Sequence, residues 1–344
     1  MTGRHMGDAK QRVLDKFDRC DRQGLWLMPE CHAEEALLHR LRAAGEVTCP
    51  CRGIFARTAA YGSAPPRVRS YKLVRTLGKT HPEWIFCLYS AAMVHGLQVP
   101  NRLLDKAHVV SALPNSPASP IARHAWALRD GDVVKVMGVQ VTSLRRTLID
   151  CLCAAPFKEG LAIVDSALHW GMTSEEELSQ WLAEDGFRKR GVRQARETLL
   201  WADGRSENGG ESIARAAMIE LGFQPPELQV EIIDPMEPDN PEYGDFGWCL
   251  SNGHWIIGEL DGLEKYRARA ANAGDIDAVI HAMAKERRRE AHINMANATV
   301  IRFSMEEVYN VEYFENLLTT AGVPRRDYVD RASRQGAARG GTSR

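Results

Sequence analysis

One stretch in the last third of the chain, residues 244–262, constrains the fold more than any other. Two apolar runs rich in aromatic and β-branched residues occupy positions 246–250 and 254–258. Between them lies the turn-forming sequence Ser251-Asn252-Gly253. Two strand-like runs around a glycine-containing turn predict a β-hairpin. The C-terminal part of the chain is therefore expected to contain a sheet.

Three carboxylates mark the open end of this predicted hairpin. Asp245 precedes the first strand, and Glu259 and Asp261 end the second. Antiparallel pairing brings those ends together, and alternation along a strand puts Glu259 and Asp261 on one face. Hard divalent cations prefer such oxygen ligands, so the pattern indicates a site for Mg²⁺ or Mn²⁺. The alternative is a hairpin whose charged ends are simply solvated.

The flanking sequence extends the pattern. Upstream, Glu211 lies in the first turn of an expected helix that ends at Gly222. Downstream, residues 275–295 are expected to form a helix and residues 298–303 a buried strand. One face of the downstream helix carries His281, Lys285, Arg288 and His292, at the spacing of a helical stripe. The expected order is helix, strand, strand, helix, strand.

This segment resembles the PD-(D/E)xK restriction-endonuclease-like superfamily, and within it the very-short-patch-repair-like nucleases. The matching residues are Glu211, Asp245, Glu259-Leu260-Asp261 and the helical stretch 285–290. The resemblance implies an α/β/α domain with a mixed sheet over residues 209–322. It also implies Mg²⁺-dependent (or Mn²⁺-dependent) hydrolysis of DNA phosphodiester bonds.

The chain departs from the family at one position, because Asp261 stands where a lysine is expected. Asp261 either joins the metal ligands or replaces the lysine and weakens catalysis. In the superfamily the lysine can come from elsewhere, and Lys265 or Lys285 could supply it. The implied catalytic residues are Asp245, Glu259, Lys265 and Lys285. The implied metal ligands are Glu211, Asp245, Glu259 and Asp261.

The first sixty residues are expected to form a winged-helix-like DNA-binding module. Helices are predicted over residues 8–22 and 33–44, followed by a basic β-wing over 45–57. The module resembles the N-terminal domain of AbiEi-family antitoxins, whose wing strand matches Gly53-Ile54-Phe55. A helical cap with a hairpin is the alternative. The residues expected to contact DNA are Arg40, Arg42, Arg52 and Arg57, together with Arg288 in the C-terminal domain.

Residues 67–203 are expected to form a mainly helical α/β middle domain. The stretches 90–97 and 138–150 resemble the central part of AbiEi-like proteins. Arg146 and Asp150, four residues apart, are expected to pair on a helix surface. His95, near a helix end, is expected to be structural.

Composition limits the compartment and the class. The net charge is −1, with a basic excess at the front of the chain and an acidic excess in the nuclease-like segment. Eight dispersed cysteines argue against a disulfide framework, and one C-x-C pair is poor support for zinc. No apolar run has the length of a membrane span, and no signal peptide is visible, so a cytoplasmic protein is expected. Residues 323–344 are expected to be a disordered basic tail.

We therefore expect an α+β multidomain chain associated with DNA. The leading hypothesis is a metal-dependent endonuclease in phage defence or repair, targeted by the N-terminal module. The alternative is a non-catalytic transcriptional regulator of the antitoxin type with a degenerate nuclease fold. Its partners would be DNA and either a toxin or a second copy of the chain, with no membrane. A third possibility is an interaction protein with neither activity.

Overall fold

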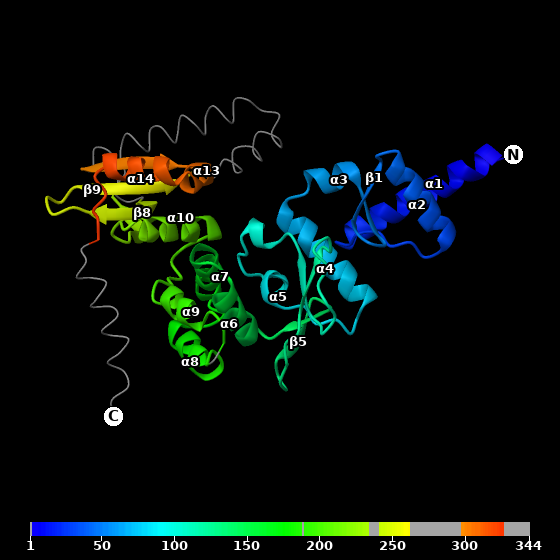
Figure 1. The fold of residues 1–344 in the computed structure, drawn as a ribbon. Helices are drawn as coiled ribbons and strands as arrows, with labels where there is room; N and C mark the ends of the chain where they lie inside the picture. Colours follow the sequence, from blue (N-terminus) through cyan, green and yellow to red (C-terminus); the bar gives the residue numbers. More distant parts are fainter. Residues whose placement is uncertain (1, 188, 234–240, 262–296, 327–344) are drawn as a thin grey trace, which may run out of the picture. The chain divides into compact units, whose positions relative to one another are not determined.

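Helices and small sheets alternate along the chain in the computed structural model, so the expected mixed α and β class is confirmed (Figure 1). The structure describes residues 2–187, 189–233, 241–261 and 297–326. The chain divides into two units, each described here by itself. The first unit contains Met1–Ala154 with Glu176–Ala195, and the second contains Ala155–Glu175 with Arg196–Arg344.

The first unit begins with two helices and a hairpin, as the sequence indicated. These elements are α1 (Thr2–Arg22), α2 (His32–Ala43), β1 (Val47–Cys51) and the antiparallel β2 (Ile54–Arg57). The apolar stripe of α2, made of Leu37, Leu38 and Leu41, is buried against Val13 and Phe17 of α1 and Phe55 of β2. Burial of this stripe fixes the hairpin against both helices.

Two further helices follow. They are α3 (Thr58–Ser63) and α4 (Pro66–Thr80). The main-chain N–H of Trp26 donates to Thr76 Oγ1 at 2.9 Å, and Lys72 Nζ lies 4.4 Å from the Trp26 ring. Lys72 also pairs with Asp21 at 2.7 Å. These contacts pack α4 directly against the N-terminal elements.

A five-stranded arrangement is built around the short segment Ile85–Cys87. Phe86 pairs with Val109 on one side and Val141 on the other. The segment thereby joins the parallel pair β3 (Ala107–Val110) and β4 (Ile121–His124) to the antiparallel pair β5 (Val133–Val136) and β6 (Val139–Thr142). The surrounding helices are α5 (Leu88–Val94), η1 (Asn101–Leu103) and α6 (Leu144–Ala154).

Helices α8 (Glu175–Asp185) and α9 (Val192–Leu199) follow in the chain. The second unit contains α7 (Phe157–His169) and α10 (Gly209–Glu220), which pack together. Its sheet has the order β10-β9-β8-β7. The strands are β7 (Glu227–Ile232), β8 (Glu242–Cys249), β9 (Trp255–Leu260) and β10 (Ala298–Phe303). Strands β7, β8 and β9 are antiparallel neighbours, and β10 runs parallel to β9.

One face of this sheet is covered by α10, α13 (Met305–Tyr309) and α14 (Val311–Thr320). Phe246, Trp248 and Phe303 supply the sheet's side of that core. The predicted hairpin, the leading helix and the last strand are all present, whereas β7 was not expected. The helix expected over residues 275–295 lies outside the described residues. So does most of the tail expected to be disordered.

Within the described ranges, no helix has the length and apolar character needed to cross a membrane. All eight cysteines are free thiols.

Candidate functional site

The open end of the β8–β9 hairpin brings the predicted carboxylates together. The last main-chain pair of the two strands is Phe246 with Gly258, and Asp245 is the next residue along β8. The N–H of Leu260 donates to Asp245 Oδ2 at 2.8 Å. The carboxylate of Asp245 therefore accepts a hydrogen bond from a main-chain N–H of the neighbouring strand. We call Asp245, Glu259 and Asp261 the acidic edge.

Glu211 reaches this edge from the first turn of α10, as expected. The side chain of Asn208 caps the helix by accepting from the N–H groups of Gly210 and Glu211. Glu211 is 3% exposed and accepts from the Glu207 N–H at 2.7 Å and from Gln229 Nε2 at 3.4 Å. Burial, with a smaller contribution from the nearby charge of Asp245, raises the pKa of Glu211 to about 7.

Arg302 of β10 also belongs to this site, although no sequence motif indicated it. In the parallel β9–β10 pair, Arg302 lies opposite Glu259. Its Nη2 is 2.8 Å from Glu259 Oε2, and its Nη1 is 3.3 Å from Asp261 Oδ1. The carboxylate of Asp261 thus faces the positively charged side chain of Arg302. The Arg302 guanidinium bridges two residues of the acidic edge.

These donors have the chemistry that a hard divalent cation requires. Glu211 lies close enough to Asp245 for the charge of one to affect the other, and a cation would relieve that repulsion. However, in the part of the chain that the structure describes, no three His, Cys, Asp or Glu side chains are arranged to hold a metal ion. Lys265, Lys285 and Arg288 lie outside the described residues.

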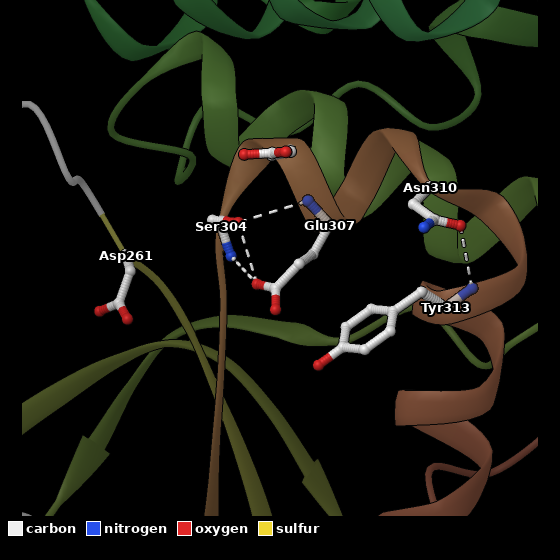
Figure 2. A pocket seen from close by; sticks show the side chains of 6 residues that line it. Asp261, Ser304, Glu307, Asn310 and Tyr313 are labelled. Atoms are coloured by element: carbon white, nitrogen blue, oxygen red, sulfur yellow. Dashed lines mark hydrogen bonds between the residues drawn. The ribbon is translucent and has the colours of Figure 1, made fainter.

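A pocket of about 490 Å³ opens beside the acidic edge (Figure 2). Its described lining is Asp261, Ser304, Glu306, Glu307, Asn310 and Tyr313. Ser304 and Glu307 form a capping box, with Glu307 Oε2 accepting from the Ser304 N–H at 2.7 Å. Hydrogen bonding by Ser304 lowers the pKa of Glu307. The S-x-x-E spacing could have indicated this helix start, and it gives Glu307 a structural role.

The arginines expected to contact DNA lie in two different settings. Arg40 and Arg42 are exposed on the last turn of α2, and Arg52 is exposed at the tip of the β1–β2 hairpin. Arg57 instead pairs with Asp18 at 2.7 Å and donates to the Leu14 carbonyl at 2.8 Å. The first three arginines are exposed, while Arg57 holds the β1–β2 hairpin to α1.

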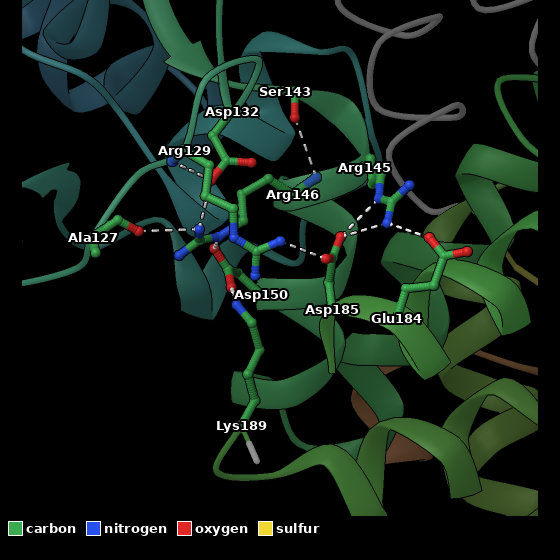
Figure 3. A network of polar contacts seen from close by, with 10 residues as sticks. All are labelled: Ala127, Arg129, Asp132, Ser143, Arg145, Arg146, Asp150, Glu184, Asp185 and Lys189. Carbon is green, nitrogen blue, oxygen red and sulfur yellow. Dashed lines mark hydrogen bonds and ion pairs between the residues drawn. The ribbon is translucent and has the colours of Figure 1, made fainter. Parts of the chain in front are cut away.

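The Arg146–Asp150 pair was expected on a helix surface, but it is part of a mostly buried network in the first unit (Figure 3). Asp150 is 5% exposed. Arg146 Nε donates to it at 2.6 Å, and Nη1 reaches Asp132 at 2.9 Å. Lys189 also pairs with Asp150. The network ties α6 to residues far away in the sequence.

Histidines of the first unit form internal contacts. His95 Nε2 lies 2.8 Å from the Thr142 carbonyl oxygen, so that nitrogen carries the donated proton. Burial lowers the pKa of His95. His108 Nδ1 and His124 Nε2 are 3.0 Å apart in stacked rings. Burial lowers the pKa of His108 to about 4, so this ring holds the contact in its neutral form, and burial also lowers the pKa of His124.

Comparison with known proteins gives relatives without a described function. No family model matches the chain. Two uncharacterized proteins of Mycobacterium tuberculosis, one from strain CDC 1551 / Oshkosh and one from H37Rv, are each 32% identical over 149 residues. The match covers 43% of this chain and 53% of each relative. The chain therefore spans about half the length of the curated relatives it matches.

Proposed function

We propose that the second unit is a Mg²⁺-dependent or Mn²⁺-dependent DNA endonuclease that hydrolyses phosphodiester bonds. The observation that carries the proposal is the position of Asp245 beside the end of β9, where its carboxylate contacts the Leu260 N–H. Leu260 lies between Glu259 and Asp261 in the chain, so this contact puts Asp245 beside the segment that carries both residues. A helix-borne Glu211 completes the set, in the order that the PD-(D/E)xK resemblance implies.

In this proposal Asp245 and Glu259 hold the cation, with Glu211 and Asp261 beside them. A bound divalent cation would polarise the scissile phosphate and lower the pKa of an attacking water. The buried Glu211 is kept in place by the Glu207 N–H and by Asn208, whose Nδ2 lies 2.5 Å from Glu211 Oε1. Fixed orientation of a carboxylate at such a site favours one binding geometry.

The N-terminal elements would supply the DNA targeting. Arg40, Arg42 and Arg52 are exposed on a helix and an adjoining hairpin, the two elements that a winged-helix domain presents to DNA. Arginine side chains in such positions contact phosphates and base edges. A targeted nuclease of this kind suits a role in phage defence or repair.

The test is cleavage of plasmid and single-stranded DNA with Mg²⁺ or Mn²⁺. We expect Asp245→Asn and Glu259→Gln to lose cutting while keeping their fold, because both substitutions retain an oxygen acceptor. Glu312→Gln on the exposed start of α14 is the matched control and should cut as the wild type does. Equal cutting by all four proteins would place the activity elsewhere or in a contaminant.

The second candidate is a non-catalytic DNA-binding regulator of the AbiEi type. The observation that favours it is the pairing of Arg302 with Glu259 and Asp261, which already neutralises two carboxylates of the acidic edge. A regulator would act on DNA through the N-terminal module and on a toxin or a second copy of the chain.

Salt-dependent DNA binding separates the regulator from an interaction protein. Replacing Arg40, Arg42 and Arg52 by Gln should reduce the slope of log affinity against log salt by roughly three, about one per lost phosphate contact. Lys135→Gln, an exposed charge on β5, is the control. A wild type that binds DNA but cuts none would support the regulator.

A further inference from the structure

We propose that strand β5 of the first unit is a docking edge for an extended, acidic segment of a partner protein, which adds to the sheet as a further strand opposite Lys135. Binding at β5 is independent of the proposed nuclease activity, because it involves the first unit alone. It also uses a different part of that unit from the arginines of α2 and the β1–β2 hairpin that are proposed to contact DNA.

Strand β5 lies at the edge of its sheet, with main-chain groups that point outward. The antiparallel register pairs Lys135 with Gln140, and it pairs Val133 with Thr142. Gln140 accepts from the Phe86 N–H at 2.9 Å, and the Thr142 N–H donates to the Phe86 carbonyl at 2.8 Å, so both bond away from β5. Opposite residues in an antiparallel pair either bond to each other or both point away. The main-chain groups of Val133 and Lys135 therefore face outward, and no partner is found for them within the described ranges.

The opposite edge of the same sheet, strand β4, is closed by a side chain. Asn115 Nδ2 donates to the Arg123 carbonyl at 2.9 Å, and Asn115 Oδ1 accepts from the Arg123 N–H at 2.7 Å. One amide side chain thus satisfies both main-chain groups of Arg123. An edge strand without such a cover is where a further strand adds to a sheet. The sheet is therefore open to extension at β5.

A tight turn holds this edge in one register. Met137 (φ +50°) and Gly138 (φ +84°) join β5 to β6. Two positive φ values in a two-residue connection are those of a type I′ turn, whose twist matches that of the paired strands. Because β5 is already a strand, a partner does not have to order it on binding.

The two faces of β5 define the chemistry of the partner. Val134 lies opposite Val141, and Val136 lies opposite Val139. The two β6 valines are 0% and 3% exposed, so a buried apolar face continues onto β5, where Val134 is 38% exposed. Strand alternation puts Lys135 on the other face, where it is exposed and has no ion-pair partner among the described residues. An added strand would meet apolar side chains on one face and a positive charge on the other.

The charge of Lys135 selects among possible partners. A carboxylate directly opposite would pair with it, whereas a like charge would repel it. Pairing two copies of β5 through both outward residues puts Val133 of one opposite Lys135 of the other. The two lysines then share one face as diagonal neighbours, which disfavours a second copy of the chain. A segment with apolar residues alternating around an acidic one fits both faces.

The experiment measures binding of fluorescein-labelled peptides to the full chain by fluorescence anisotropy. The probe is a short peptide of alternating threonine and valine with a glutamate at its centre, and the matched peptide has a lysine there. The wild type should bind the glutamate peptide about tenfold more tightly, the difference between an opposite and a like charge in one cross-strand pair.

Three variants sharpen the test. Lys135→Glu should reverse the preference between the two peptides. Lys135→Pro removes an outward N–H but none of the bonds to β6, so it should bind neither peptide. Lys79→Glu, a charge reversal at an exposed position of α4, is the control and should keep the wild-type preference. Circular dichroism checks that each variant is folded.

The outcomes separate the possible occupants of the edge. A preference for the glutamate peptide that Lys135→Glu reverses and Lys79→Glu keeps supports the proposal. Equal binding of both peptides by the wild type, no binding of either, or binding that survives in Lys135→Pro overturns it. A wild-type dimer in sedimentation that Lys135→Pro dissociates would assign the edge to a second copy and also overturn it. If Lys135→Pro does not fold, the reversal in Lys135→Glu decides.

Discussion

The buried ion pair between Asp165 of α7 and Arg215 of α10 offers the sharpest test of what holds the second unit together. Arg215 Nη2 lies 2.6 Å from Asp165 Oδ2, and the two side chains are 5% and 0% exposed. Asp165 also accepts from the Asp203 N–H at 2.8 Å, and Arg215 donates to the Trp201 carbonyl at 2.7 Å. Burial raises the pKa of Asp165 to about 6 despite its partner.

The expected loss in the free energy of unfolding depends on which buried charge is left without its partner. Each single variant, Asp165→Asn or Arg215→Met, leaves one buried charge without its partner. Each should lower the free energy of unfolding by about 3–5 kcal/mol. The double variant has no buried charge and keeps an acceptor for the Asp203 N–H. In this variant the Trp201 carbonyl loses its donor, which costs about 1–3 kcal/mol. The coupling energy between the two positions should therefore be at least ~3 kcal/mol.

Urea unfolding at pH 7.5, followed by circular dichroism and tryptophan fluorescence, measures these differences, provided that the m-value is the same for all variants. Arg205→Met is the control, because the Arg205 side chain is 62% exposed and its ion pair with Asp203 should contribute about 1 kcal/mol or less. Additive single effects, or singles that each cost less than about 1 kcal/mol, would refute the reasoning.

The remaining predictions concern the first unit. His108 has a pKa of about 4 in the folded chain against an ordinary 6.5, so the unfolded chain takes up more protons as the pH falls from 6.5 to 4. The free energy of unfolding should decrease by up to about 3 kcal/mol over that window, and much less in His108→Gln. A pH titration of urea midpoints that shows equal slopes for both proteins would contradict this. Gly191 has φ +86°, and a Cβ there would lie 1.9 Å from the Cys153 carbonyl oxygen. Gly191→Ala should therefore cost several kcal/mol, at least ~3, and an unchanged melting temperature would show that the loop adapts freely.

Local patterns predicted the elements of the hairpin region well. The two predicted apolar runs correspond to β8 and β9, and the predicted glycine-containing turn joins them. The leading helix, α10, carries Glu211 in its first turn. These features depend on neighbours within a few residues, which a single sequence reveals.

Strand β7 was missed, although its residues alternate between polar and apolar. The structure shows why alternation alone misleads there. Leu228 packs in the core with Phe246, whereas Val230 packs on the other face with Ile257. Gln229 between them has φ +52°, which turns the strand. A strand that changes face carries a weaker period-2 signal for any one core.

Long-range placement was beyond the sequence for a different reason. The pairing of Arg302 with Glu259 depends on a parallel register between strands separated by about forty residues of chain. The sequence predicts Arg57 as a DNA contact because it is basic and lies in the β1–β2 hairpin. Its pairing with Asp18, which the sequence does not reveal, depends on how the hairpin packs onto α1. In both cases the partner is set by tertiary packing.

The contact between Asp245 and the Leu260 N–H has a spectroscopic consequence. One amide proton of β9 is held by a side chain rather than by a strand, so its exchange with solvent and its chemical shift follow the state of a single carboxylate. The neighbouring amides of β9 and β10, held by main-chain carbonyls, provide an internal reference a few ångströms away. Leu260 thus gives this chain a built-in reporter on its acidic edge, readable without substrate, turnover or any label beyond nitrogen-15.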